Sequence, residues 1–189
     1  MKNKSFYLAL VGIFIILIFI AFFSFQKTET KNIDVENLEE LEAKFSLLND
    51  ERTNFCAGPE IVSVVDSERL QGSCCSAMDF HRYTEQIEGL KKFSYIEEIP
   101  KDPYDIPKKW ADEFIEYYQT DLVVEQQKIY DDASEISDEK GPCCCKCWRW
   151  YAYGGLAKYL IVNYDFTAEQ IAEVWDLSDG CGGSGHSHI

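Results

Sequence analysis

Residues 142–164 read PCCCKCWRWYAYGGLAKYLIVNY, and the fold prediction depends on this segment more than on any other. Four of its first six residues are cysteines, and a strongly apolar, aromatic run follows them. Pro142 interrupts the preceding chain and suits the first turn of a helix, where its missing amide proton costs nothing. We predict a helix here, with Trp148, Trp150 and Tyr153 in the core and the cysteines in its first turn.

Apolar residues recur at helical spacing in four further segments, and strand-like alternation is limited to residues 60–65. Pro107 and the capping pair Thr167 and Gln170 indicate the starts of two of these helices. The soluble part is therefore predicted to be mainly α, as one small helical domain with a cysteine-rich helix start. The four segments are residues 38–48, 80–90, 110–122 and 171–177.

Residues 6–25 are apolar apart from Ser24 and the hydroxyl of Tyr7. A helix needs about 20 such residues to cross a bilayer, whereas a cleaved signal peptide usually has ~7 to 15 and small residues at its cleavage site. Bulky phenylalanines follow Ala21, so no such site is visible. We predict an uncleaved, single-pass transmembrane helix.

The charges beside this helix predict its orientation. Lys2 and Lys4 precede it, and positive residues tend to stay on the cytoplasmic side, although Lys27 and Lys31 lie just beyond its other end. A lone N-terminal anchor also usually exports the domain that follows it. We predict a protein of the cell membrane with an extracytoplasmic C-terminal domain.

The chain of 189 residues has room for one domain after its anchor. Its formal net charge of −15 would repel phosphate backbones, so no nucleic-acid partner is expected, and no particular protein partner is indicated. The predicted parts are a membrane anchor at 1–27, a juxtamembrane helix and linker at 28–50, a cysteine-rich α-helical domain at 51–181, and a flexible Gly/Ser/His tail at 182–189.

The cysteines are clustered along the sequence. Adjacent cysteines rarely bridge each other, because a disulfide needs Cα atoms ~4.4 to 6.8 Å apart with suitably aimed side chains. Clustered thiols are better suited to binding a soft cation. The eight cysteines are Cys56, Cys74, Cys75, Cys143, Cys144, Cys145, Cys147 and Cys181.

A helical turn would place Cys143 and Cys144 on the same face as Cys147, and the helix dipole there is expected to lower thiol pKa values. Thiolates select soft ions, of which Cu(I) and Zn(II) are the predicted cofactors. The protein would store, transfer or sense the metal. The predicted ligands are Cys143, Cys144, Cys145, Cys147, Cys181, Cys74, Cys75 and His81, with His186 and His188 as auxiliary candidates.

Two other interpretations use the same cysteines. Cys144 and Cys147 form a C-x-x-C, as in thiol-disulfide oxidoreductases, although the usual βαβ context is missing. Structural disulfides would instead staple the domain into a structural or interaction module. Motifs for covalent haem, phosphate-binding loops and zinc proteases are absent from the sequence, so an enzyme is not favoured.

The motif PCCCKC at residues 142–147 resembles the PCYCGC motif for which a family of bacterial extracytoplasmic proteins is named. The proline and three of the cysteines match, while Cys144 replaces the tyrosine and Lys146 the glycine. Cys181, between two glycines, is similar to the family's later cysteine region, with one cysteine in place of two. The resemblance implies export and a thiol-based site, and it brings no known reaction.

Overall fold

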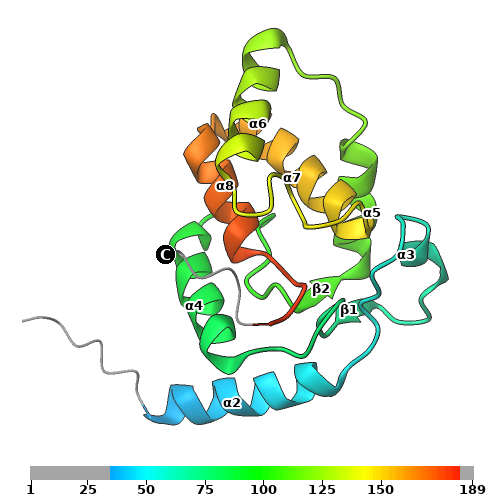
Figure 1. Cartoon of the computed structure of the whole chain (residues 1–189), viewed down its shortest axis with the longest axis vertical. Coiled ribbons are helices and arrows are strands. Elements are labelled where there is room, and N and C mark those ends of the chain that lie inside the picture. The colour runs from blue at the N-terminus through cyan, green and yellow to red at the C-terminus, as the bar shows by residue number, and fades with distance from the viewer. Residues whose placement is uncertain (1–34, 184–189) are drawn as a thin grey trace, which may run out of the picture. The chain divides into compact units, whose positions relative to one another are not determined.

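The computed structural model describes residues 35–183, and this part of the chain is mainly helical (Figure 1). The chain divides into two compact units, residues 1–37 and 38–189, and the cysteines belong to the second. The described elements are α2 (Val35–Asp50), α3 (Ile61–Val64), β1 (Arg69–Gln71), α4 (Phe80–Leu90), the 3-10 helix η1 (Lys91–Phe93), β2 (Asp105–Pro107), α5 (Lys108–Tyr117), α6 (Val124–Ile136), α7 (Trp148–Tyr164) and α8 (Ala168–Leu177).

The predicted transmembrane helix at residues 6–25 lies outside the described residues, as do residues 184–189 of the predicted tail. Within residues 35–183, no helix combines the length and the apolar character needed to cross a bilayer. The anchor and the orientation that follows from it stay predictions.

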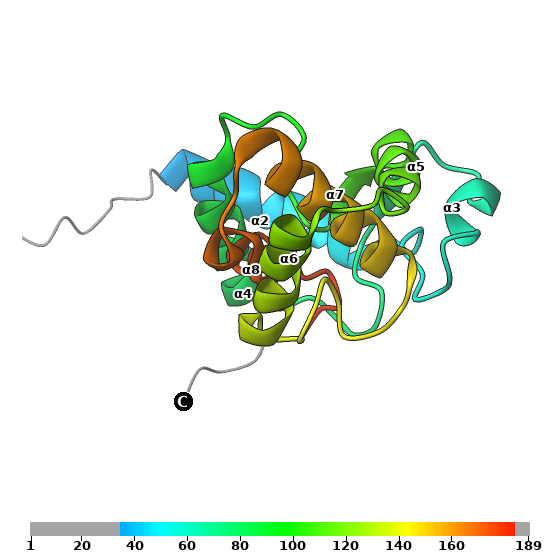
Figure 2. The same ribbon diagram turned by 90° about the horizontal axis from the view of Figure 1, so that it is seen from above.

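Helix α7 carries much of the core, as its apolar sequence predicts. Trp148, Ala152, Leu156 and Leu160 are buried along it, and it packs against α5, α6 and α8. Figure 2 shows α7 between α5 on one side and α6 with α8 on the other. Gly155 brings the α5 and α7 backbones together, because a Cβ there would overlap a backbone carbonyl oxygen of α5.

The start of α7 differs from the prediction. Residues 141–147 form bends, and the helix begins at Trp148 with Cys147 as its extended N-cap. Trp148 donates its backbone N–H to the Ala57 oxygen at 2.8 Å and its indole N–H to Asn54 Oδ1 at 3.1 Å. Contacts with a distant segment therefore fix the helix start, and the four neighbouring cysteines lie on a loop that precedes it.

Two further expectations were wrong. The predicted helix at residues 110–122 ends at Tyr117, and α6 begins separately at Val124. Residues 60–65 contain the helical turn α3 in place of a strand, because Val62 and Val65, three residues apart, both face the core while Val64 is 68% exposed. The sheet of the described part consists of β1 paired antiparallel with β2.

Helix α2 packs onto its own domain, as its apolar stripe predicts. Leu48 is buried in a second apolar cluster that also contains Tyr83 and Tyr104. Asp102 anchors this region, since its carboxylate accepts a hydrogen bond from the Tyr83 hydroxyl at 2.8 Å and pairs with Lys44 at 2.8 Å. The segment between α2 and β1, which carries Cys56, is thereby held against the domain at its start.

Candidate metal centre

All eight cysteines meet at one place, and each comes from a loop or a chain end between helices. Cys56 follows α2, Cys74 and Cys75 follow β1, residues 143–147 precede α7, and Cys181 follows α8. All eight lie in the described part of the chain and all are free thiols. Four segments distant in sequence thus contribute sulfur atoms to one site.

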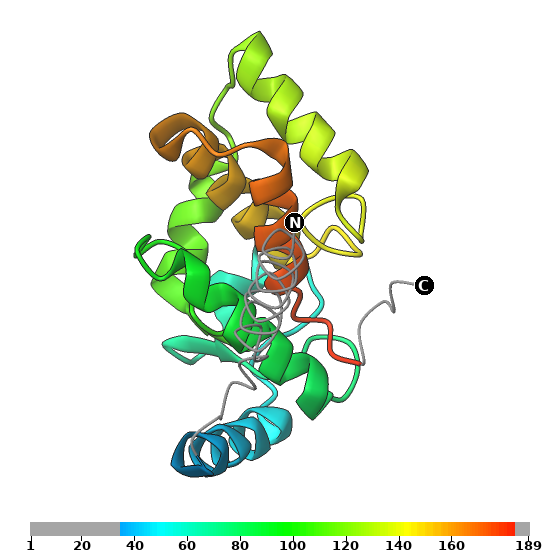
Figure 3. The same ribbon diagram turned by 90° about the vertical axis from the view of Figure 1, so that its left-hand side faces the viewer.

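Backbone hydrogen bonds hold the Cys181 segment beside residues 74–76. The Ser76 N–H donates to the Cys181 oxygen at 2.9 Å, and the Cys74 N–H donates to the Gly180 oxygen at 3.0 Å. Gly182 has φ +80° and leaves no room for a Cβ against the Ser76 carbonyl oxygen. Figure 3 shows the red segment after α8 turning toward the segment that leads into α4. The bare backbone around Cys181 permits this close approach.

Asn54 positions the segment that carries Cys56. Its side chain is 3% exposed, donates from Nδ2 to the Gly72 oxygen at 2.7 Å, and accepts from the Trp148 indole. The Ala57 oxygen accepts from the Trp148 N–H, so both sides of Cys56 are attached to the start of α7. Cys56 therefore faces the cysteines of the loop before α7.

The sulfur atoms lie 3.2 to 3.9 Å apart in six pairs. A disulfide would require about 2.05 Å, whereas two sulfurs bound to one ion through bonds of about 2.3 Å lie about 3.8–4.0 Å apart. The pairs are Cys56–Cys145 at 3.2 Å, Cys74–Cys75 at 3.6 Å, Cys74–Cys181 at 3.8 Å, Cys143–Cys147 at 3.7 Å, Cys143–Cys181 at 3.9 Å and Cys144–Cys181 at 3.3 Å.

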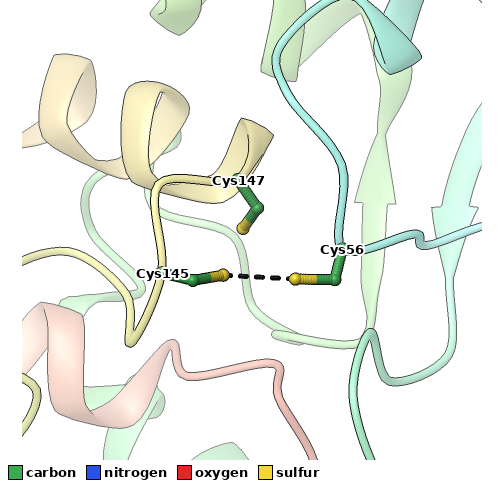
Figure 4. A group of neighbouring side chains, drawn as sticks. All are labelled: Cys56, Cys145 and Cys147. Atoms are coloured by element: carbon green, nitrogen blue, oxygen red, sulfur yellow. Dashed lines mark hydrogen bonds between the residues drawn. The ribbon is translucent and has the colours of Figure 1, made fainter.

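These sulfurs form three groups of three whose members lie within 4.8 Å of one another. Figure 4 shows the first group, in which the three sulfurs point toward a common space. Each group spans at least two chain segments, so no group can form from one loop alone. The groups are Cys56, Cys145 and Cys147; Cys74, Cys75 and Cys181; and Cys143, Cys144 and Cys181.

A buried positive charge lies beside the cluster. Arg149 is 1% exposed, and its guanidinium stacks near the rings of Trp148 and Tyr153. Nη2 donates to the Ser178 oxygen at 2.5 Å, while Nη1 has no hydrogen-bond partner among the described residues. Because arginine stays protonated in proteins, the interior holds a full positive charge with one donor nitrogen unused.

The neighbours of this charge include the cluster. Burial lowers the pKa of Arg149, but Tyr153, Cys74, Cys143 and Asp179 favour its charged form and raise the pKa overall. Asp179 already accepts a hydrogen bond at 3.1 Å from the backbone N–H of Cys181. The buried guanidinium is therefore placed to stabilise negative charge on the sulfurs.

The pKa values of the buried thiols Cys143, Cys147 and Cys181 are raised, contrary to the expectation from a helix dipole. The hydrogen bond with Cys143 and burial both raise the pKa of Cys147. For Cys143, the hydrogen bond with Cys147 lowers the pKa, but contact with Cys181 and burial outweigh it and raise the pKa overall. The sulfurs do not sit in the first turn of a helix, so the dipole that was expected to favour thiolates is not available to them.

The structure brings seven of the eight predicted ligands together and adds Cys56, which was not predicted. The seven predicted cysteines all belong to the three groups, whereas His81 does not, and its exposed imidazole contacts Glu85 at 3.2 Å. Cys56 was not among the predicted ligands because no neighbouring cysteine or fixed spacing marks it. The only signal in the sequence is that the chain has eight cysteines and Cys56 is one of them. His186 and His188 lie outside the described residues.

Comparison with known proteins gives no relative: no family model, no curated protein and no solved structure matches this chain. The resemblance of residues 142–147 to the PCYCGC motif stays a prediction. The class of protein that the fold and the site define is a mainly helical domain whose clustered free cysteines could hold a metal ion.

Proposed function

We propose that this protein binds soft metal ions through cysteine thiolates, on a domain that a membrane anchor carries outside the cytoplasm. The convergence of eight free cysteines from four segments, at sulfur separations suited to shared metal ligation, carries this proposal. Storage, transfer and sensing are the roles that such a site supports.

The buried guanidinium of Arg149 favours a cluster of negatively charged thiolates and disfavours a set of eight neutral thiols. A buried charge without a partner is costly, and the nitrogen Nη1 has none among residues 35–183. Metal binding displaces the thiol protons and creates negative charge next to Arg149. The guanidinium then gains anionic sulfur neighbours in addition to Asp179.

The donor set favours Cu(I) or Zn(II). All members of the three groups are sulfur ligands, which soft cations prefer. An iron–sulfur cluster places iron and sulfide between its cysteine ligands and would hold their sulfurs farther apart than 3.2–3.9 Å. The site therefore suits direct ligation of single ions.

Thiol-disulfide exchange fits the geometry less well. Cys144 contacts Cys181 and Cys147 contacts Cys143, so the two C-x-x-C cysteines have different partners. A module stapled by disulfides would also need bonded sulfur pairs, and all eight cysteines are free.

The extracytoplasmic location rests on the apolar run at residues 6–25 and on the lysines before it. An acidic exported domain would also concentrate cations near the membrane surface. Protease treatment of intact cells tests this part of the proposal. Digestion of the domain is the expected result, and its protection until the cells are lysed would reverse the orientation.

Metal analysis of protein prepared without oxygen tests the metal site. The full chain, reconstituted with Cu(I) or Zn(II) and desalted, should retain metal and hide its thiols from a thiol reagent. Cys147→Ser should retain less metal than the wild type, whereas His81→Ala, a matched control at an exposed position outside the cluster, should retain as much. Absence of retained metal in the wild type, or recovery of four disulfides under these conditions, would remove the proposal.

A further inference from the structure

We infer that the cysteine cluster is a polynuclear Cu(I) site that holds up to three ions, one in each group of three sulfurs, with the Cys181 sulfur shared by two of them. This inference rests on the proposed function and specifies its metal and stoichiometry. The number of groups, their size and their shared member are the observations that carry it.

The size of the groups favours Cu(I). Among the described residues the sulfurs form sets of three, and no four potential ligands lie within 4.8 Å of one another. Structural Zn(II) sites are almost always four-coordinate and tetrahedral, whereas two or three thiolates satisfy Cu(I). Three sites of three sulfurs each match this grouping, whereas a tetrahedral site would need a fourth sulfur to move within reach.

The position of Cys181 joins the ions. Its sulfur lies 3.8 Å from Cys74, 3.9 Å from Cys143 and 3.3 Å from Cys144, so it belongs to both the second and the third group. Hydrogen bonds to Ser76 fix its backbone between the two groups. Nine ligand positions are thus filled by eight cysteines because one sulfur bridges two ions.

The first group is linked to the others. Cys147 lies 3.7 Å from Cys143 of the third group. The three sites therefore form one continuous cluster of sulfur atoms.

Each group also has one ligand at the surface. Cys56, Cys75 and Cys144 are exposed, one in each group, while Cys143 and Cys147 are buried. An exposed thiolate can pass to an incoming metal or thiol partner while the remaining ligands keep the ion in place. This arrangement suits a protein that loads and releases Cu(I), since a purely structural site would enclose its ion.

Native mass spectrometry of the copper-loaded full chain counts the ions. Three Cu(I) per chain are expected, together with the luminescence of shielded copper–thiolate clusters. Cys56→Ser alters one group and should leave two ions, whereas Cys181→Ser alters two groups and should leave one. Cys56 is exposed, so its replacement tests the count with little risk to the fold, and circular dichroism checks both variants.

The possible failures are distinguishable. A single Cu(I) in the wild type, or equal losses in the two variants, would overturn the polynuclear site but leave soft-metal binding intact. Two Zn(II) ions in sulfur tetrahedra that copper does not displace would overturn the choice of copper. A chain that retains no soft metal would end both proposals.

A separate cavity of about 450 Å³ carries a second, independent inference. Its walls consist of four aromatic rings, including Trp110, Tyr117 and Tyr159, and of three glutamates, and no lysine or arginine of the described residues lines it, although Lys109 pairs with Glu113 at 3.6 Å. We propose that it binds a small organic cation with an alkylated ammonium group. The rings offer negative faces to such a group, and the carboxylates supply the opposite charge.

The arrangement of Glu98 supports an organic ligand. Its carboxylate accepts hydrogen bonds from the Tyr159 hydroxyl at 2.9 Å and the Tyr164 hydroxyl at 3.2 Å, and its backbone oxygen accepts from the Trp110 indole at 2.7 Å. The carboxylate is thus held among the rings. The glutamates of this cavity form no close group of metal ligands, which disfavours an inorganic cation.

Calorimetric titration with choline, and with 3,3-dimethyl-1-butanol as its uncharged counterpart, tests this site. Choline should bind and the alcohol should not, and Glu113→Gln, at an exposed position on the cavity wall, should weaken choline binding several-fold. A parallel titration with phosphatidylcholine vesicles shows whether the ligand is a lipid headgroup or a free solute. Equal heats for choline and the alcohol, or no binding of choline, would refute the proposal.

Discussion

The metal-free domain should lose stability as the pH rises above about 9. Buried thiols in the folded state have pKa values raised above their ordinary value of 9.0. The unfolded chain releases these protons near pH 9 while the folded chain keeps them, so the unfolded state binds fewer protons. The free energy of unfolding must then fall with increasing pH.

The size of this decrease in the free energy of unfolding follows from the number of buried thiols. Each thiol that stays protonated only in the folded state contributes about 1.4 kcal/mol per pH unit. Cys143, Cys147 and Cys181 are at most 9% exposed, so together they give a slope of up to about 4 kcal/mol per pH unit. Because domains are stable by ~5 to 15 kcal/mol, the step from pH 9 to 10 removes a large part of the total.

Bound metal should reverse the sign of the dependence of the free energy of unfolding on pH. Metal-bound sulfurs are thiolates in the folded state, so below pH 9 the unfolded chain binds more protons and the free energy of unfolding rises with pH. Urea titrations at pH 7, 8, 9 and 10, with reductant and with either chelator or Cu(I), measure both slopes. Cys143→Ser should reduce the metal-free slope by about a third. A metal-free stability that stays flat or increases between pH 9 and 10 would show that the thiols are not buried as described.

Three further substitutions test how the domain supports the cluster. Gly155→Ala should lower the free energy of unfolding by about 1–3 kcal/mol in urea titrations, because its Cβ would overlap the Phe114 oxygen and push α5 from α7. Asn54→Ala should cost a similar ~1–3 kcal/mol by leaving the Trp148 indole unpaired, and it should also weaken Cu(I) binding in competition with a chelator. Thr167→Ala removes the cap of α8 and should cost about 1 kcal/mol with the copper count unchanged.

The sequence predicts best where local chemistry decides the structure. The helix α8 begins at its capping pair as predicted, α4 follows the apolar periodicity of its segment, and α7 lies within the predicted apolar run. The glycine Gly182, next to Cys181, allows the close backbone approach to Ser76. In each case the signal lies within a few residues of the feature.

The errors arise where contacts with residues distant in sequence determine the local structure. The first turn of α7 could not be located from Pro142, because Asn54 and Ala57 accept the hydrogen bonds that fix Trp148 at the start of the helix. Cys56 escaped prediction as a ligand for the same reason, since only these contacts bring it to Cys145. Spacing along the chain carries no information about such long-range pairs.

The placement of the cysteines also connects metal binding to folding. The four segments that carry them are loops and a chain end, and the apolar core lies around α7, away from the sulfur cluster. Hydrogen bonds hold the Cys56 and Cys181 segments in place, but few apolar side chains join the loops beyond Trp150. Ions that bind sulfurs from several segments would cross-link these loops and stabilise the folded state in proportion to the metal present. Loss of metal would remove these cross-links while the hydrogen bonds between the segments and the helical core remain, so the cluster can respond to metal supply without unfolding the domain.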